Sequence, residues 1–345
     1  MGGGSWSSDE YEAREASRAK TGASPFAYTD KVIAATPYSA RKVHDKMNPK
    51  GINRECRDSD EHPNSRPIAV FFDVTGSMGG IPRVLQTKLS KLMTMLLLKG
   101  ACPDPQICMG AIGDANCDKA PLQVGQFESD IKIEEDLGNI WIEGGGGGTA
   151  QESYEMAAYF AARHMKMDCF EKRGEKGYLF LMGDEMCYGH LRAAKVSEFI
   201  GDDISEECEL FKPNPRMDLQ ELGYPLAKIL AEASEKFEVF FIFTPSHNYS
   251  ADCGHVEWWK ALLHERVIVM PDPAAVCETI AGVVAMLEGM DHSDIDSHLK
   301  AAGADSKTAS TVKNALAPLA SRSVAKGTVK GDLATSGAGS GTKTL

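Results

Sequence analysis

The 345-residue sequence has no apolar stretch of the roughly 18 to 20 residues that a membrane-spanning helix requires. Its first residues lack the apolar core of a secretory signal, and Trp6 stands where an N-myristoylation signal needs Ser or Thr. Its nine cysteines show no paired spacing and no CxxC motif. We therefore expect a chain without a membrane span, a cytoplasmic location, and cysteines that are mainly buried and reduced.

Positive charge is in deficit, because 37 Lys and Arg stand against 49 Asp and Glu, for a formal net charge of -12. This balance, with no RNA-binding motif, argues against nucleic acid as the main ligand. Residues 11–55 are the exception, since nine Lys and Arg face five acidic residues there. We expect this basic arm to fold back onto the acidic remainder of the chain by electrostatic attraction.

The most informative segment that is present joins a strand to a set of oxygen ligands. Residues 68–72 are a short apolar run typical of a buried parallel strand, and residues 81–98 repeat apolar side chains at helical spacing. Asp73, Thr75 and Ser77 lie between them, on a loop at the carboxyl end of the strand, where open α/β sheets bind ligands. A carboxylate and two hydroxyls suit a hard cation such as Mg²⁺ or Mn²⁺.

Two later segments repeat this placement. Five consecutive glycines, 144–148, end in Thr149, and a helical pattern follows them. The apolar run 178–182 predicts another buried strand, which leads through Gly183 to Asp184. Hydroxyls and carboxylates are thus expected to gather at one edge of one sheet.

These residues resemble the von Willebrand factor type A (vWA) domain, whose metal-ion-dependent adhesion site (MIDAS) combines a DxSxS loop with a distant Thr and a distant Asp. Asp73, Thr75 and Ser77 match the loop, and Thr149 and Asp184 match the distant ligands. Thr75 departs from the family pattern, which usually has Ser there, but it keeps the hydroxyl. The resemblance implies a Rossmann-like α/β fold: a doubly wound, mostly parallel sheet with one antiparallel edge strand and helices on both faces.

The resemblance also implies a protein-binding function. Mg²⁺ prefers six oxygen ligands, so two carboxylates and three hydroxyls leave it under-neutralised, and an Asp or Glu of a partner protein can complete the shell. Intracellular relatives often work with AAA-type ATPases, which the resemblance implies as partners. The loops at the same edge are expected to form the rim that contacts the partner: Glu185, Tyr188, His190, His247 and Tyr249.

Three alternatives stay open from the residues alone. A metal-dependent hydrolase would use Glu185, His190 or His247 as a general base, although none of them lies in a recognisable hydrolytic motif. A structural protein would use the metal only for stability. The loop after the strand could also be a helix cap and tight turn without any metal.

The chain divides by composition into four parts. We expect a polar N-terminal arm with one short helix near 9–20, the vWA domain, a short helical segment and a disordered tail rich in Gly, Ser and Thr. Their ranges are 1–65, 66–290, 291–320 and 321–345.

Within the central domain, the sequence predicts three further features. Residues 106–113 and 120–127 are expected to pair as a hairpin that supplies the antiparallel edge strand. Residues 216–236 are expected to form a helix interrupted at Pro225, and 273–288 another helix. The acidic, Pro-punctuated segment 201–215 is expected to be an insertion, either a second contact surface or a solvated loop.

Overall fold

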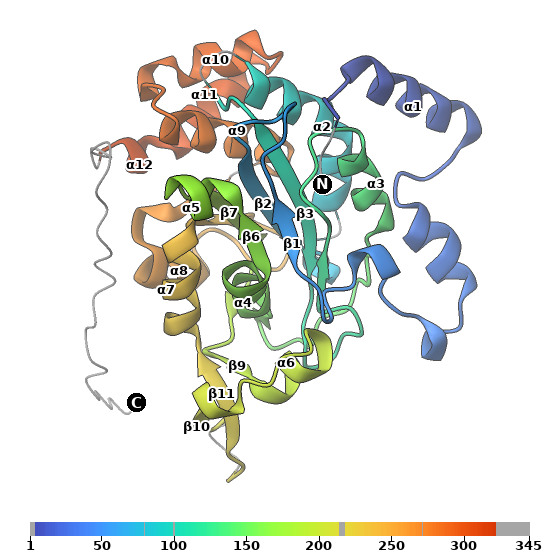
Figure 1. Cartoon of the computed structure of the whole chain (residues 1–345), viewed down its shortest axis with the longest axis vertical. Helices are drawn as coiled ribbons and strands as arrows, with labels where there is room; N and C mark the ends of the chain where they lie inside the picture. Colours follow the sequence, from blue (N-terminus) through green and yellow to red (C-terminus); the bar gives the residue numbers. More distant parts are fainter. Residues whose placement is uncertain (1–3, 79, 99–100, 214–217, 271, 322–345) are drawn as a thin grey trace.

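A six-stranded sheet forms the centre of the protein, seen here in a computed structural model (Figure 1). The structure describes residues 4–321 except 79, 99–100, 214–217 and 271. The strands follow the order β13-β12-β7-β2-β3-β4, and all neighbours are parallel except β3 and β4. Their bounds are Arg66–Asp73 (β2), Pro105–Ile112 (β3), Leu122–Val124 (β4), Gly177–Gly183 (β7), Phe237–Phe243 (β12) and Val267–Val269 (β13).

The side chains of β2 alternate between two hydrophobic cores. Ile68, Val70 and Phe72 belong to one core, and Ala69 and Phe71 belong to the other. This alternation is the consequence of strand geometry when both faces of a sheet are covered. The antiparallel edge strand β4 confirms the predicted hairpin.

Helices cover both faces of the sheet (Figure 1). The first core contains side chains of α2 (Ile81–Leu97), α3 (Lys132–Asn139) and α9 (Val276–Leu287). The second contains side chains of α4 (Tyr154–His164), α7 (Leu226–Lys236) and α8 (His255–Leu263). The predicted α/β class, with a mostly parallel sheet, is therefore confirmed, as is the helix expected at 273–288.

Small sheets extend this framework. Strands β1 (Arg54–Cys56) and β6 (Met165–Met167) pair in parallel, as do β5 (Gln151–Glu152) and β8 (Met186–Cys187). A three-stranded antiparallel sheet has the order β10-β11-β9 and lies below the main sheet in Figure 1, close to α6 (Ala193–Phe199). Its strands are His190–Arg192 (β9), Glu209–Phe211 (β10) and Glu221–Pro225 (β11).

The β10-β11-β9 sheet corrects two predictions. The helix expected over 216–236 is wrong for Glu221–Pro225, which forms β11, whereas Leu226–Lys236 is helical. Residues 216 and 217 lie outside the described residues. Gly223 and Pro225 disfavour a helix interior, and pairing with both neighbours makes this segment a strand. The insertion expected at 201–215 contains β10, so its described part is not simply a solvated loop.

Both flanking segments pack against the central unit. Helix α1 (Ser8–Thr21) confirms the helix expected in the arm; Tyr11 enters the first core, and Arg14 and Arg18 form ion pairs with Glu134 of α3. The basic arm thus folds back onto an acidic surface, as its charge predicts. At the other end, α10 (Ile295–Ala301) and α11 (Ser306–Ala315) also contribute side chains to the first core, and α12 (Ala317–Ser321) follows.

Two further expectations concern the C-terminal tail and the lack of a membrane span. The disordered tail expected at 321–345 lies outside the described residues from 322 onward. Among the helices that the structure describes, none combines the length and the apolar character needed to cross a membrane.

Candidate metal centre

Asp73 is the buried end of β2 and accepts three hydrogen bonds. The amide and the hydroxyl of Thr75 donate to its Oδ1 over 2.7 and 2.6 Å, and the hydroxyl of Tyr154 donates to its Oδ2 over 3.0 Å. Thr75 therefore lies against Asp73, and its hydroxyl donates to the carboxylate. The carboxylate is completely shielded from solvent.

Asp184 and Ser77 meet at the same edge of the sheet. Asp184 follows β7, the parallel neighbour of β2, and its Oδ1 accepts a hydrogen bond from the hydroxyl of Ser77 over 3.1 Å. The other oxygen of Asp184, Oδ2, is buried and has no hydrogen-bond partner among the described residues. The structure thus brings together the DxTxS loop and the distant Asp that the sequence analysis selected.

The glycine run wraps around the loop after β2. Gly145 accepts a hydrogen bond from the amide of Gly76 over 3.0 Å, and the amide of Gly144 donates to the carbonyl of Val74 over 3.2 Å. A Cβ atom on Gly145 would lie 2.1 Å from Oδ1 of Asp118, which leaves no room for a side chain. The backbone of this run therefore passes close to the loop after β2 and to Asp118.

Thr149 is not joined to the other predicted ligands. Its side chain is exposed, and its hydroxyl bonds the carbonyl of Gln151 over 3.2 Å and the hydroxyl of Tyr188 over 3.1 Å. Within the part of the chain that the structure describes, no hydrogen bond connects it to Asp73, Ser77 or Asp184. In this arrangement the fifth predicted ligand faces Tyr188 instead.

Glu152 is a candidate that the sequence analysis missed. It lies on β5, is 2 % exposed, and its Oε2 has no hydrogen-bond partner. Burial raises the pKa of Glu152 far above its ordinary range, and the nearby charge of Asp73 raises it further. The available signal was a carboxylate three residues after Thr149, directly before a buried helix.

In the described part of the chain, three buried oxygens near the carboxyl ends of the strands lack hydrogen-bond partners: Asp184 Oδ2, Glu152 Oε2 and Thr244 Oγ1, the last directly after β12. A buried oxygen without a partner costs about 1 to 3 kcal/mol, so native structures seldom leave one unexplained. A bound cation would satisfy such oxygens, and all three are hard donors of the kind that Mg²⁺ and Mn²⁺ accept. The chemistry of these donor atoms therefore suits the implied metal.

The carboxyl groups at this site have raised pKa values, as expected for buried carboxylates close to one another. Burial raises the pKa of Asp73, and the neighbouring charge of Asp184 adds to the effect. Burial likewise raises the pKa of Asp184. No described Lys or Arg forms an ion pair with Asp73, Glu152 or Asp184, so the described part of the chain supplies no cationic side chain that would stabilise their ionised forms.

Protein carboxylates alone do not complete a metal site here. Among the described residues, no group of three or more His, Cys, Asp or Glu side chains is arranged to hold a metal ion. The donor set predicted from the sequence has only two carboxylates, Asp73 and Asp184, and its other members are hydroxyls. Hydroxyl oxygens, and oxygens from outside this chain, would have to supply the remaining positions.

Two of the predicted rim residues border Asp184. Glu185 is half-buried; burial raises its pKa to about 7, the charge of Asp184 contributes, and the hydroxyl of Tyr249 partly offsets the effect. The ring of Tyr249 lies 4.6 Å from that of His255, centroid to centroid, and Nδ1 of His255 contacts the Asp184 carbonyl oxygen over 2.9 Å. Glu185 and Tyr249 thus lie beside the site.

The other three rim residues differ in their surroundings. The hydroxyl of Tyr188 donates to Oδ2 of Asp114 over 3.1 Å, in addition to its bond with Thr149. His190 lies on β9, where it pairs with Glu209 over 3.1 Å and stacks on Phe211. His247 is exposed on the loop after β12.

Comparisons with known proteins give only distant similarities. No protein-family model and no curated protein matches the sequence. The pilus adhesin SpaC from Lactobacillus rhamnosus GG in its open conformation is similar in structure, with 10% identity, a TM-score of 0.43, and coverage of 68% of this chain and 31% of that one. Proximal thread matrix protein 1 from the mussel byssus is similar with 12% identity, a TM-score of 0.39, and coverage of 68% and 47%. This chain therefore spans less than half the length of either protein.

Proposed function

We propose that residues 66–290 form a doubly wound vWA domain whose MIDAS-like site binds Mg²⁺ or Mn²⁺ and, through it, an acidic side chain of a partner protein. The observation that carries this proposal is the hydrogen bond between Ser77 and Asp184, with the second oxygen of Asp184 buried and unpaired. It joins the loop after β2 to the end of β7, where the vWA family binds its cation.

Each residue has a distinct role in this proposal. Asp73, Thr75, Ser77 and Asp184 would hold the ion, and the Tyr154 hydroxyl fixes the orientation of Asp73. When bound, the ion supplies an open coordination position for a carboxylate oxygen. Thr149 would join the donor set only after its bond to Tyr188 is broken.

The partner follows from the charge of the site and from the vWA resemblance. Two carboxylates leave a divalent ion free to accept a third from another protein, and assemblies that contain an AAA-type ATPase are the partners that the resemblance implies. A cytoplasmic location is part of the proposal. All nine cysteines lie among the described residues and are free thiols, which supports a reducing compartment.

Cation binding is tested by thermal unfolding with Mg²⁺ or Mn²⁺ against EDTA. A ligand that binds only the folded state stabilises it by about 2.7 kcal/mol at 100 times its Kd. We expect wild type to be stabilised and Asp184→Asn to lose the effect, while Asp60→Asn, at an exposed position, keeps it. Equal stabilisation of all three proteins would place the cation elsewhere.

Partner capture is tested by affinity purification from the organism's own lysate in Mg²⁺ and in EDTA. We expect partners to be retained in Mg²⁺ and lost in EDTA and with Asp73→Asn. Retention in EDTA would rule out a metal-dependent function, and stabilisation without any partner would favour a structural role. Turnover of phosphoesters or peptides that Glu185→Gln abolishes would favour the hydrolase instead.

A further inference from the structure

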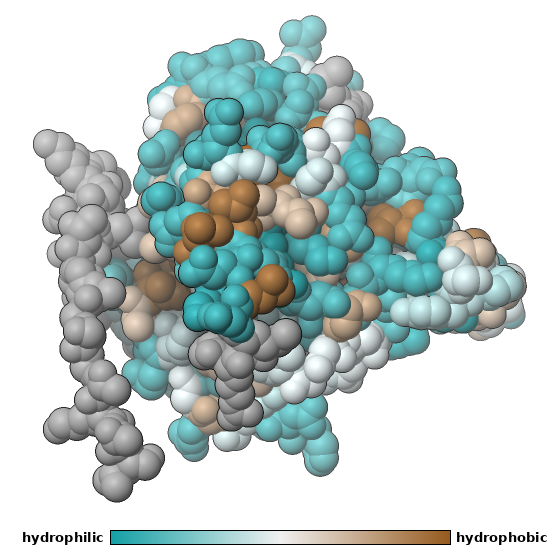
Figure 2. Space-filling model, turned by 90° about the horizontal axis from the view of Figure 1, so that it is seen from below, coloured by the Kyte–Doolittle hydropathy of each residue, from teal (hydrophilic) through white to brown (hydrophobic). Residues whose placement is uncertain are grey.

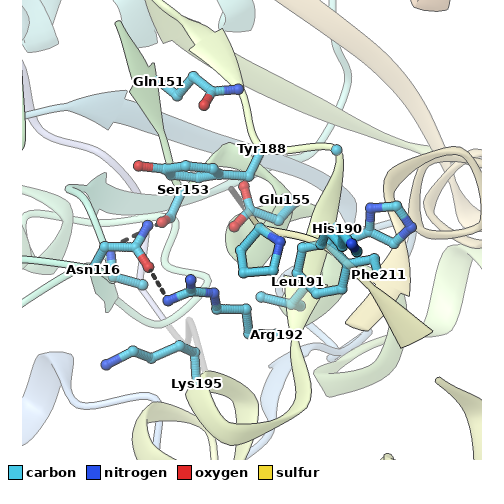
Figure 3. Close-up of a pocket in the computed structure, with 14 residues that line it drawn as sticks. Asn116, Gln151, Ser153, Glu155, Tyr188, His190, Leu191, Arg192, Lys195 and Phe211 are labelled. Carbon is cyan, nitrogen blue, oxygen red and sulfur yellow. Dashed lines mark hydrogen bonds between the residues drawn. The ribbon is translucent and has the colours of Figure 1, made fainter. Parts of the chain in front are cut away.

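A pocket of about 290 Å³ opens between the β10-β11-β9 sheet, α6 and the loop before α4 (Figure 3). Its wall has aromatic surface from Tyr188 and Phe211 and positive charge from Arg192, Lys195 and Lys212. We call it the basic pocket, because three cations line it in a chain whose net charge is -12. A volume of this size suits a small molecule.

The aromatic part of the wall is fixed by one face of the β10-β11-β9 sheet. The ring of Phe211 stacks on that of His190, with 4.4 Å between the ring centroids, and both lie against Gly223 of β11. A Cβ atom on Gly223 would lie 2.5 Å from the Phe211 ring, so the glycine leaves the space that the stacked rings occupy. Arg192 is paired with Gly223 and therefore projects from this same face.

The exposed leucines of the sheet lie on its other face. Leu210 and Leu222 are paired with each other, and along their strands they alternate with Phe211 and Gly223 of the pocket face. Figure 2 looks onto this end of the molecule and shows hydrophobic patches among a mainly hydrophilic surface. The chemistry of the pocket is therefore decided by its own lining residues and not by these leucines.

Arg192 is held in place and still has a free face for an anion. Its Nη1 donates to Oδ1 of Asn116 over 2.7 Å, and its Nε pairs with Glu221 over 3.0 Å (Figure 3). A guanidinium group carries five N–H donors, and neither of these contacts uses Nη2. Arg192 is thus a positioned cation with donors left for an oxyanion.

The two lysines of the pocket have exposed partners. Lys195 pairs with Glu198 over 2.8 Å, and Lys212 pairs with the fully exposed Asp218 over 2.9 Å. Exposed ion pairs of this kind contribute little to stability, so a ligand anion can replace these partners at small cost. Neither Glu198 nor Asp218 is among the residues that line the pocket.

Glu155 is the one acidic side chain among the lining residues. It is buried on α4, and Sγ of Cys187 contacts its Oε2 over 3.2 Å. Burial raises the pKa of Glu155 to about 8, so it is mostly uncharged at neutral pH and does not repel an anion.

We propose that the basic pocket binds a small dicarboxylate, in which a short hydrocarbon chain joins the two carboxylates. Separate cations around the pocket match two separate carboxylates, and the aromatic surface of Tyr188 and Phe211 matches the hydrocarbon between them. A phosphate ion carries its charge at one centre and would leave the aromatic surface without a contact. The inference goes beyond the proposed function, because it requires neither a bound cation nor a protein partner.

A matched series of ligands tests the charge requirement. Glutarate, glutaramate and glutaramide have nearly the same shape and carry two, one and no negative charges at neutral pH. Saturation-transfer NMR in EDTA at low ionic strength gives the Kd of each, with inorganic phosphate as a further ligand. We expect glutarate to bind at least about fivefold more tightly than glutaramate and than phosphate, and glutaramide to bind more weakly than glutaramate.

Two lysine substitutions locate the binding. Lys195→Gln removes a cation of the basic pocket and is expected to weaken glutarate binding at least about threefold, with less than about twofold change for glutaramide. Lys260→Gln is the matched control, since Lys260 of α8 pairs with Glu257 over 2.8 Å at the same spacing as Lys195 with Glu198. Because Lys260 does not line the pocket, this variant is expected to bind both ligands as wild type does.

Several outcomes would overturn the inference. They are equal Kd values for glutarate, glutaramate and glutaramide, no measurable binding of glutarate at millimolar concentrations, and phosphate binding as tight as that of glutarate. Equal glutarate affinity in the two lysine variants would also overturn it, because binding would then lie outside the basic pocket. None of these outcomes alters the Mg²⁺-dependent unfolding of wild type, so failure of the pocket is distinguishable from failure of the metal centre.

Discussion

The hydroxyl of Tyr154 and the carboxylate of Asp73 are hydrogen-bonded over 3.0 Å, although 81 residues separate them in the chain. Both side chains are completely buried. Tyr154 opens α4, and Asp73 closes β2, so the bond ties a helix of the second core to the candidate ligand.

Tyr154→Phe removes this bond and leaves Oδ2 of Asp73 buried without a donor. We expect the free energy of unfolding in EDTA to fall by about 1 to 3 kcal/mol, measured by urea denaturation. Tyr159→Phe is the control, because the acceptor of its hydroxyl, Asp202, is partly exposed and keeps a second partner in His164. An equal loss in both variants would show that the Asp73 bond has no special importance.

Gly183→Ala tests the space beside the same tyrosine. A Cβ atom at Gly183 would lie 1.7 Å from the Tyr154 hydroxyl oxygen, so β7 or the ring must move. We expect destabilisation of about 1 to 3 kcal/mol by thermal unfolding. Gly189→Ala is the control, since nothing lies within 4 Å of its Cβ position, and it is expected to stay within about 0.5 kcal/mol of wild type. Equal stability of the two variants would contradict the packing around Tyr154.

Thr75→Val and Thr149→Val separate the two predicted threonine ligands. Thr75 donates to Asp73, whereas Thr149 is exposed and faces Tyr188. We expect Thr75→Val to weaken Mg²⁺ binding at least about tenfold and Thr149→Val to weaken it less than about threefold. Calorimetric titration measures both affinities. A larger loss with Thr149→Val would show that the glycine run rearranges when the ion binds.

Asp168 provides a pH-dependent contribution to stability. Burial alone would raise the pKa of Asp168, but Lys172, the amide of Asp58 and Arg57 outweigh burial and lower it to about 2. Because the folded pKa lies below the ordinary value of 3.8, this stability is present above about pH 4 and is lost as the pH falls toward 2.

Asp168→Asn should therefore cost about 1 kcal/mol at pH 7, after allowance for screening near the surface, and almost nothing at pH 2. Urea denaturation across this pH range measures the difference. The exposed Asp60→Asn is expected to change little at either pH. A cost for Asp168→Asn that does not depend on pH would contradict the assignment.

Tyr11 of the N-terminal arm is 1% exposed and packs in the first core, so we expect it to hold α1 against the central unit. Tyr11→Ala is expected to release α1 and to speed tryptic cleavage after Arg14 and Arg18 by at least about tenfold, since local unfolding exposes these sites. Tyr38→Ala, at a position that is 57% exposed, is the matched control and should cleave at the wild-type rate. Equal rates in all three proteins would mean that the arm is held mainly by its ion pairs.

The main sheet could be predicted because its strands are continuous apolar runs followed by glycines and polar residues. Asp73 and Asp184 could be placed together from the rule that parallel strands end at the same edge. Strand β11 could not be predicted, because Leu222 and Tyr224 also fit a helical pattern that continues into α7. Pairing with β9 and β10 makes this segment a strand and not a helix.

The conformation of the glycine run could not be predicted from the sequence either. Three glycines there have positive φ, and the direction in which such a loop turns depends on contacts with Asp118 and Gly76, which are distant in sequence. The loop therefore exposes Thr149 and buries Glu152, an exchange that a spacing rule for MIDAS ligands cannot foresee.

The hydrogen bonds that the structure describes between the glycine run and the loop after β2 join main-chain atoms, so side-chain substitutions elsewhere at this edge leave them in place. Tyr188, Arg192 and Lys195 lie outside that main-chain contact. Under the proposed function, substitutions at these positions should therefore change partner recognition and leave the position of the cation unchanged.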